Sequence, residues 1–348
     1  MNTALSILAA LLVLSVFVFV HELGHYLAGR LLGFKILEFS IGMGPKLLKK
    51  EKNGILYSLR AFPIGGMCRF YGEDEEANDG DSFNSHNVFK RIAVVAAGPL
   101  MNIIFALLIA TITLSAYGDY YYLPVVVEFA DGESPAKEAG MLEGDVILGV
   151  DGIDISYDTD FSKIVEIANG ENAKFKVLRD GEEITLEVKG IYNESTDEKR
   201  MGISYYPYGA VERERFTFFE AIGNSFDYVV SIIGEMFSFI GNIFTEGVKE
   251  GEVGGPVAVI NILGEAVRMG FETVLRISIL MSINLGVMNI LPIPALDGGR
   301  LVFLIIEAIR GKALPAEKEG MVHFIGIVLL YGLIIFLSVK DVMGLFGG

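Results

Sequence analysis

The feature that most constrains this chain is the pentapeptide His21-Glu22-Leu23-Gly24-His25, which lies in the second half of an apolar stretch from Ala4 to Ala28. On a helix, residues i and i+4 share a face, so both imidazoles would project together. Two histidines at this spacing suit two ligands of a tetrahedral Zn²⁺, with Glu22 beside the metal as general base. Ionisable groups within a membrane span are costly and usually functional. The pattern predicts a metal site inside a spanning helix, and the alternative interpretation is a pair of helix-packing histidines.

Composition places this stretch in a membrane protein with a water-exposed module. Of 348 residues 52% are hydrophobic, and the mean hydropathy of +0.48 indicates several spans. The single cysteine, Cys68, excludes an internal disulfide and a cysteine-based zinc cluster. The net charge of −16 argues against nucleic acid as a partner. Much of this charge falls in residues 118–215, with about 22 acidic and about 10 basic side chains, so that segment is expected to face water.

Apolar runs of spanning length occur four times along the chain. The expected spans are about Ala4–Ala28, Ile92–Tyr117, Ile277–Leu291 and Met321–Val339. The stretch Phe216–Val248 is amphipathic and carries glycines, and Ala258–Arg276 continues its character. We interpret that region as interfacial helices lying along the membrane rather than as a fifth span.

Two regions show β-type patterns instead. Phe34–Phe70 contains apolar runs separated by glycines and lysines, which predicts short strands close to the membrane face or dipping into it. Non-helical backbone at that depth is tolerated only where it lines protein or a wet cavity. Leu123–Gly190 alternates as four short strands, with a tight hairpin at Asp180-Gly181 and a short helix over Ser134–Met141. This second region is expected to be a compact soluble domain.

A hydrolytic zinc site needs a third protein ligand and one open position. Asp297 is the best candidate, because the helix of the third span must break at the following prolines and leave Asp297 in a loop just past its end. The alternative interpretation is an ordinary Asp-Gly turn. Asn102 and Asn289 are polar residues within or at the end of spans, and they are candidates to donate to the reacting carbonyl or to the substrate backbone. Interhelical hydrogen bonding is the alternative for both asparagines, and His86 is a minor candidate for the metal.

Lysines and arginines follow the first and third spans, whereas the segment after the second span carries few. The positive-inside rule therefore places the loops after the first and third spans in the cytoplasm and the acidic module outside. The first and third spans run in the same direction in this arrangement. His21, His25 and Asp297 can then meet near the cytoplasmic end of the bundle.

These motifs resemble those of the site-2 protease family, the M50-type zinc intramembrane metalloproteases that include the bacterial regulator-of-sigma-E proteases. The matches cover most of the chain and are HELGH at His21–His25, F-S-I-G-x-G at Phe39–Gly44, P-I-G-G at Pro63–Gly66, A-G-P-x-x-N at Ala97–Asn102 and N-x-x-P-x-P-x-L-D-G-G at Asn289–Gly299. The pairing of the first and last motifs is specific. The soluble module resembles a PDZ domain in S-P-A-x-x-A-G-M at Ser134–Met141 and G-D-x-I at Gly144–Ile147.

The resemblance implies that His21, His25 and Asp297 bind Zn²⁺ and that Glu22 is catalytic. It further implies that Asn289, Pro292 and Pro294 help to hold an unwound substrate. The implied substrates are single-span membrane proteins, such as anti-sigma factors or remnant signal peptides, and the implied location is the bacterial cell membrane. The active site would lie toward the cytoplasmic side and the PDZ domain outside, where it is expected to act as a gate for substrates.

The expected fold is a polytopic α-helical membrane protein of about four spans, with a membrane-associated β-loop and an inserted α+β PDZ domain. The expected divisions are a first half of the membrane core over residues 1–122, with the β-loop at about 33–70, a PDZ domain over 123–190, a linker with interfacial helices over 191–270, and a second half of the core over 271–348. The alternative function is a membrane-anchored PDZ scaffold with a non-catalytic metal site.

Overall fold

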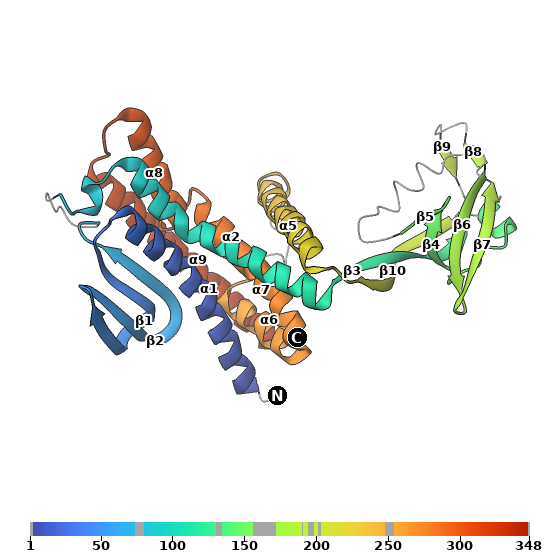
Figure 1. The fold of residues 1–348 in the computed structure, drawn as a ribbon, viewed down its shortest axis with the longest axis horizontal. Coiled ribbons are helices and arrows are strands. Elements are labelled where there is room, and N and C mark those ends of the chain that lie inside the picture. Colours follow the sequence, from blue (N-terminus) through green and yellow to red (C-terminus); the bar gives the residue numbers. More distant parts are fainter. Residues whose placement is uncertain are drawn as a thin grey trace. The chain divides into compact units, whose positions relative to one another are not determined.

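The computed structural model describes residues 3–73, 80–129, 134–155, 172–189, 191–193, 198–200, 203–247 and 254–346. The chain divides into two compact units (Figure 1). The helical unit comprises Met1–Thr113 and Phe218–Gly348, and the β unit comprises Leu114–Thr217.

Seven helices account for much of the helical unit in the described part of the chain. They are α1 (Thr3–Leu32), α2 (Val88–Tyr117), α5 (Phe218–Glu246), α6 (Pro256–Met269), α7 (Phe271–Ile290), α8 (Asp297–Arg310) and α9 (Ala316–Phe346). By length and composition α1, α2, α5, α7 and α9 are each able to cross a membrane. Four of the five match the expected spans, and the fifth is α5, whose amphipathic sequence predicts an interfacial helix. The number of spans and the interfacial placement of α5 therefore stay predictions.

The end of α7 follows from the local sequence. Leu291 precedes a proline, and a residue in that position is pushed out of the helical region; its φ of −61° and ψ of 146° are extended. The chain remains non-helical to Leu296, and Asp297 then begins α8. The expected helix break is present, but the prediction that Asp297 lies in a loop was wrong: Asp297 is the first residue of α8, a helix that was not expected from the sequence.

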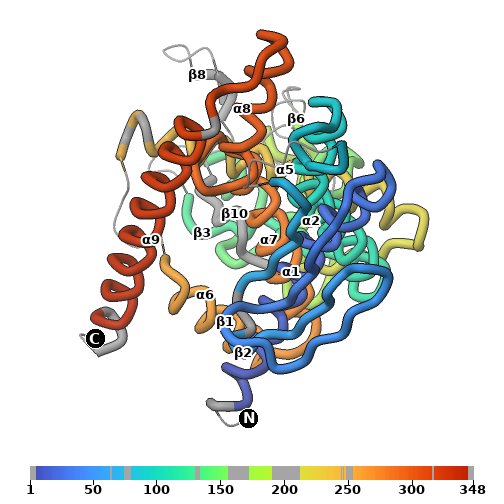
Figure 2. Tube along the Cα trace, turned by 90° about the vertical axis from the view of Figure 1, so that its left-hand side faces the viewer, coloured from blue at the N-terminus to red at the C-terminus, as the bar shows by residue number. Residues whose placement is uncertain are grey.

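Strands β1 (Ile36–Lys52) and β2 (Ile55–Phe70) form a folded ribbon that is longer than the predicted runs. Residues 38–41 of β1 pair with residues 66–69 of β2 on one side and with residues 56–59 on the other. Residues 46–52 pair with 55–60, so the ribbon folds back on itself. β2 packs against α1, and the ribbon lies beside that helix in both views (Figures 1 and 2).

Two apolar clusters hold the helical unit together. The first joins α1, the β1–β2 ribbon and α2 with Leu304 of α8. The second joins α2, α5 and α7 through buried aliphatic side chains that include Ile109, Val229 and Ile283. Thr111 of α2 also shares a 2.9 Å hydrogen bond with Ser225 of α5. Because α8 contributes to the first cluster, its N-terminal residue is fixed relative to α1 and α2.

The β unit contains a sheet in the order β10-β3-β4-β6-β7, with β5 paired to β4. Its elements are β3 (Asp119–Phe129), α3 (Pro135–Glu138), β4 (Val146–Val150), β5 (Ile153–Asp154), β6 (Asn172–Arg179), β7 (Glu182–Lys189) and β10 (Ile203–Glu214). A separate pair is formed by β8 (Ile191–Asn193) and β9 (Glu198–Arg200). The four predicted strands are present, and β10, the partner of β3, was not predicted.

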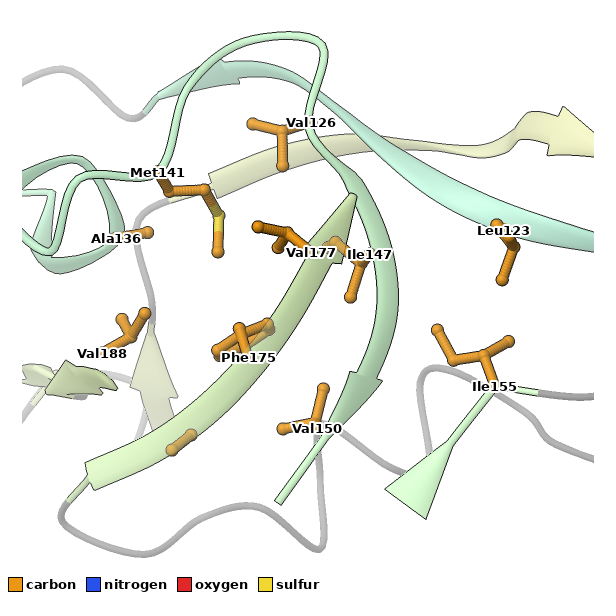
Figure 3. Close-up of a cluster of buried hydrophobic side chains, with 11 residues drawn as sticks. Leu123, Val126, Ala136, Met141, Ile147, Val150, Ile155, Phe175, Val177 and Val188 are labelled. Atoms are coloured by element: carbon orange, nitrogen blue, oxygen red, sulfur yellow. The ribbon is translucent and has the colours of Figure 1, made fainter. Parts of the chain in front are cut away.

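One continuous core stabilises this unit. Met141, Ile147, Phe175 and Val177 are fully buried and converge from the α3 segment, β4 and β6 (Figure 3). The turn between β6 and β7 has positive φ at both Asp180 and Gly181, as a two-residue hairpin requires. A mainly antiparallel sheet with one short helix fits the expected α+β character, while its assignment as a PDZ domain stays a prediction.

Candidate metal centre

Two of the predicted ligands lie on one face of α1, one helical turn apart. The imidazole rings of His21 and His25 have centroids 4.9 Å apart, and their Nε2 atoms are 3.2 Å apart. Each residue is 9% exposed. The i, i+4 spacing has therefore brought two nitrogen donors together inside an apolar helix, as the sequence predicts.

Asp297 reaches the same point from the start of α8. Its Oδ2 lies 2.9 Å from His21 Nε2 and 3.4 Å from His25 Nε2. These three residues offer ligand atoms that all lie within 4.8 Å of one another, and they are the group of this kind found among the described residues. The predicted third ligand thus joins the first two, although some 270 positions separate them in the chain.

The dimensions of this group fit a tetrahedral metal ion. At metal–ligand distances of about 2.0–2.2 Å, adjacent ligand atoms of a tetrahedral zinc site are about 3.3–3.5 Å apart. The three observed separations, 2.9, 3.2 and 3.4 Å, are close to that spacing. Two imidazole nitrogens and one carboxylate oxygen also match the donor set of hydrolytic zinc sites, which leave a fourth position for water.

A hydrogen bond between His25 and α2 determines which ring nitrogen of His25 faces Asp297. His25 Nδ1 lies 2.9 Å from the carbonyl oxygen of Val94 in α2, and a carbonyl can only accept, so Nδ1 donates. In the neutral ring Nε2 then carries a lone pair, which points at the oxygen of Asp297 and at the other imidazole. Atoms that converge in this way repel one another unless a proton or a metal cation lies between them. The arrangement is therefore compatible with a metal ion at this position.

Two glycines allow α1 and α2 to approach closely at the site. A Cβ on Gly24 would meet the carbonyl oxygen of Ala97, and a Cβ on Gly98 would meet the imidazole of His25. The small residues of the Ala97–Asn102 motif thus serve the close helix approach that such residues permit. Without it, Val94 could not reach His25.

Contacts from three directions hold the start of α8. A Cβ on Gly299 would lie 2.6 Å from the Ile293 carbonyl oxygen, so the turn before α8 is tight against the helix. The backbone N–H of Ala295, whose φ is +78°, donates to His323 Nδ1 of α9 at 3.2 Å. Ion pairs connect α8 to the rest of the unit; they are Arg300 with Glu73 and Arg91 with Glu307.

Glu22 belongs to α1, and its side chain lies against β2. A Cβ on Gly66 of β2 would be 2.6 Å from Glu22 Cγ, so the strand passes directly over this side chain. The backbone N–H of Cys68 donates to the Glu22 carboxylate. Burial raises the pKa of the Cys68 thiol, which keeps it neutral and fits a packing role. The general base predicted from the motif is thus held by the β-ribbon next to the cluster.

Of the remaining candidates, Asn102 contacts the cluster, whereas Asn289, Pro292, Pro294 and His86 make other contacts. Asn102 contacts His21 from α2, with Nδ2 3.3 Å from His21 Nδ1. Asn289 donates to the Leu285 carbonyl one turn earlier in α7. Pro292 is exposed, and Pro294 packs against Gly326 of α9. His86 stacks on Phe34, with ring centroids 4.1 Å apart.

Several contacts of the site were not predicted. The Val94 carbonyl and the Cys68 N–H are backbone groups, and a sequence pattern does not reveal which backbone group a side chain will contact. The partners Arg91 and Glu307 are 216 positions apart, and neither belongs to a recognisable motif. The close contact at Gly98 of the Ala97–Asn102 motif was predictable, since small residues in a span indicate close helix packing.

Comparison with known proteins agrees with this geometry. The model of peptidase family M50 matches residues 9–333. The chain is 35% identical to a protein of Agrobacterium fabrum named "Putative zinc metalloprotease Atu1380", over 97% of this chain and 95% of that protein. It is also 35% identical to "Putative zinc metalloprotease CPE1693" of Clostridium perfringens, over 97% and 98%.

A plant protein is similar over nearly the whole chain as well. "Membrane metalloprotease ARASP, chloroplastic" of Arabidopsis thaliana is 34% identical over 98% of this chain and 79% of its own length. The family match, the several apolar helices and the His-His-Asp cluster agree with one another. The chain is a multi-pass membrane protein that belongs to peptidase family M50.

Proposed function

We propose that this protein is a zinc-dependent endopeptidase that cleaves other membrane proteins within or next to the bilayer. The observation that carries the proposal is the convergence of His21, His25 and Asp297 on one point, with two of them inside an apolar helix of spanning length. Relatives named zinc metalloproteases over the full chain support the choice of metal and of reaction.

Different residues of the chain would carry out metal binding and proton transfer. His21, His25 and Asp297 would hold the metal, which supplies Lewis acidity and lowers the pKa of water to near 7. Glu22 accepts the proton of the attacking water and returns it to the leaving amine. The Cys68 N–H orients the Glu22 carboxylate for both transfers. The apolar surroundings exclude bulk water, so each of these electrostatic interactions is stronger than it would be in solution.

The substrate class follows from the depth of the site and from the strand beside it. A transmembrane helix has its carbonyls hydrogen-bonded, so it must unwind before it can be cut. β2 passes over Glu22, and a strand in that position can capture extended backbone by strand addition. We therefore propose single-span membrane proteins as substrates, such as anti-sigma factors or remnant signal peptides, cut toward the cytoplasmic side of a bacterial cell membrane. Asn289, Pro292 and Pro294 are proposed to help hold the unwound segment.

Glu22→Gln tests the reaction without removing a metal ligand. The full-length protein, purified in detergent and mixed with single-span substrates, is expected to lose cleavage by a factor of about 10²–10⁴ in this variant while keeping its zinc. Comparing membrane proteomes of cells that express each form would identify span-derived fragments that vanish with the variant. Equal cleavage by the two forms would contradict the role of Glu22, and absence of cleavage by the wild type would favour the membrane-anchored scaffold with a non-catalytic metal.

A further inference from the structure

Asn102 occupies a fully buried position in α2, directly behind one of the imidazoles. Its Nδ2 atom lies 3.3 Å from His21 Nδ1. Its Oδ1 atom is buried and has no hydrogen-bond partner among the residues that the structure describes. An unpartnered amide oxygen in an apolar interior costs about 1–3 kcal/mol. Its presence beside a proposed metal ligand needs an explanation.

The position of this side chain is set by α7. Ser282 Oγ donates to the main-chain carbonyl of Asn102 at 2.8 Å. A Cβ on Gly286 would lie 2.9 Å from the Pro99 carbonyl oxygen and 3.5 Å from Asn102 Cβ, so the two helices are in close contact here. The backbone of Asn102 is therefore fixed. The freedom that remains is the orientation of its terminal amide, whose oxygen and nitrogen have nearly the same shape.

The orientation of the amide decides which nitrogen of His21 carries the proton. His21 Nε2 is the atom that faces Asp297 and His25. To bind a metal through Nε2, a neutral imidazole must carry its proton on Nδ1, and that N–H needs an acceptor. With Nδ2 toward His21 the amide offers a donor and leaves Oδ1 orphaned. Turning the amide by half a rotation presents Oδ1 to Nδ1–H.

The second histidine has the equivalent contact already in place. His25 Nδ1 donates to the Val94 carbonyl, which leaves Nε2 free to bind a metal. Val94 and Asn102 both lie on α2, two turns apart. One helix therefore provides an outer acceptor for each of the two imidazoles that α1 presents.

We propose that Asn102 is a positioning residue: with the metal bound, its Oδ1 accepts the Nδ1–H of His21 and holds the ring in the tautomer whose Nε2 binds the metal. This inference rests on the proposed zinc-dependent function. It assigns Asn102 a different role from the substrate contact expected from the sequence, because the side chain is fully buried behind His21.

Zinc affinity tests this role without a cleavage assay. The measurement is competition between the full-length, detergent-solubilised protein and a chromophoric zinc chelator. Asn102→Leu has a similar shape but no acceptor, and is expected to weaken zinc binding about 10–100-fold. Asn102→Asp retains an acceptor and is expected to stay within about threefold of wild type or to bind more tightly. The matched control is Thr113→Val, which removes another fully buried polar group of α2 and is expected to leave zinc affinity unchanged.

The outcomes separate this inference from the proposed function. Wild-type affinity in Asn102→Leu, or an Asn102→Asp variant as weak as Asn102→Leu, would overturn the positioning role while leaving the zinc enzyme intact. Absence of zinc binding by the wild type would overturn both. Nitrogen NMR of the zinc-loaded wild type, with labelled histidines, needs no variant to fold: His21 is expected to show a protonated Nδ1. A bare Nδ1 with a protonated Nε2 would overturn the inference.

Discussion

Asp145 in the β unit is 1% exposed and accepts three hydrogen bonds at its carboxylate. Leu142 donates its backbone N–H at 2.8 Å, and Arg179 donates from Nε and Nη2 at 2.7 Å each. Burial alone would raise the pKa of Asp145, but the hydrogen bonds from Arg179 and Leu142 outweigh it and hold the pKa below its ordinary value. The ionised form is therefore favoured in the folded state.

We predict that Asp145→Asn lowers the free energy of unfolding of the β unit by about 2–3 kcal/mol at pH 7. A carboxylate with a depressed pKa stabilises the fold above its unfolded pKa, near 4, and this contribution is lost as pH falls through the folded pKa. The gap between wild type and variant should therefore be complete at pH 7 and shrink below about pH 4. Thermal unfolding of the full-length protein across this range measures it.

The control for this prediction is Asp180→Asn, one residue past Arg179 in an exposed turn. It removes a carboxylate without removing a buried hydrogen bond, and is expected to change stability by less than about 0.5 kcal/mol. A gap between wild type and Asp145→Asn that stayed constant from pH 7 to pH 3 would show that the loss comes from packing instead of from the charge.

At the level of single residues, the convergence of His21, His25 and Asp297 was predictable from the sequence, but the contacts that hold these residues in place were not. The i, i+4 spacing of His21 and His25 fixes their common face by helix geometry alone. Asp297 was identified by the break after α7, but its exact place was not, because α8 depends on packing of Leu304 against a distant cluster. The contact between Asn102 and His21 joins residues 81 positions apart, and no local pattern specifies it.

The approach of α1 and α2 is the contact between elements on which the site depends. We predict that Gly98→Ala displaces the His25 ring, because the added Cβ would collide with the imidazole. The expected result is a loss of zinc affinity of at least about tenfold, since a ligand held by the Val94 carbonyl cannot move without breaking that bond. Zinc titration of the purified variant measures the effect.

Gly234→Ala in α5 is the matched control, because the same methyl group there has no neighbour within 4 Å among the described residues. It is expected to keep wild-type zinc affinity and to gain slightly in stability from the higher helix propensity of alanine. Equal zinc affinity in Gly98→Ala and Gly234→Ala would contradict the close helix contact.

Among the elements, long apolar helices were predicted well and partner-dependent ones were not. The four expected spans appear with boundaries shifted by a few residues, since a continuous apolar run of this length has few other solutions. The sequence of β10 does not by itself predict a strand, because this strand pairs with β3, which lies more than 70 positions earlier in the chain. Helix α7 starts at Phe271 instead of Ile277, because the helical conformation is interrupted at Gly270, which has a φ of +129° and separates α6 from α7.

For the whole molecule, we propose that the β unit limits access of substrates with large domains outside the membrane. The acidic composition of residues 118–215 and their insertion between α2 and α5 motivate this role. Deleting the whole domain expected over residues 123–190 would remove most of β3 and leave part of β10 without its partner strand. The register of the two strands supplies a better design. Leu123 of β3 pairs with Ala210 of β10, so an Asn-Gly turn can replace residues 124–209 and leave the remaining residues of these two strands paired.

We predict that this shortened protein cleaves substrates with and without a bulky outer domain at similar rates, whereas wild type prefers the smaller ones. The rate for the small substrate should change little, because the cluster of His21, His25 and Asp297 belongs to the helical unit. Cleavage of matched substrates in liposomes, with retained zinc as a control for folding, measures the preference. Persistence of the wild-type preference in the shortened protein would remove the gating role.

The proposed proteolysis requires one metal ion bound jointly by α1 and the start of α8. An anomalous difference map collected at the zinc edge from crystals of the full-length protein tests this directly. We predict one peak within about 2.2 Å of His21 Nε2, His25 Nε2 and an oxygen of Asp297. A zinc-replete crystal with its peak elsewhere, or with no peak at these three side chains, would contradict the account.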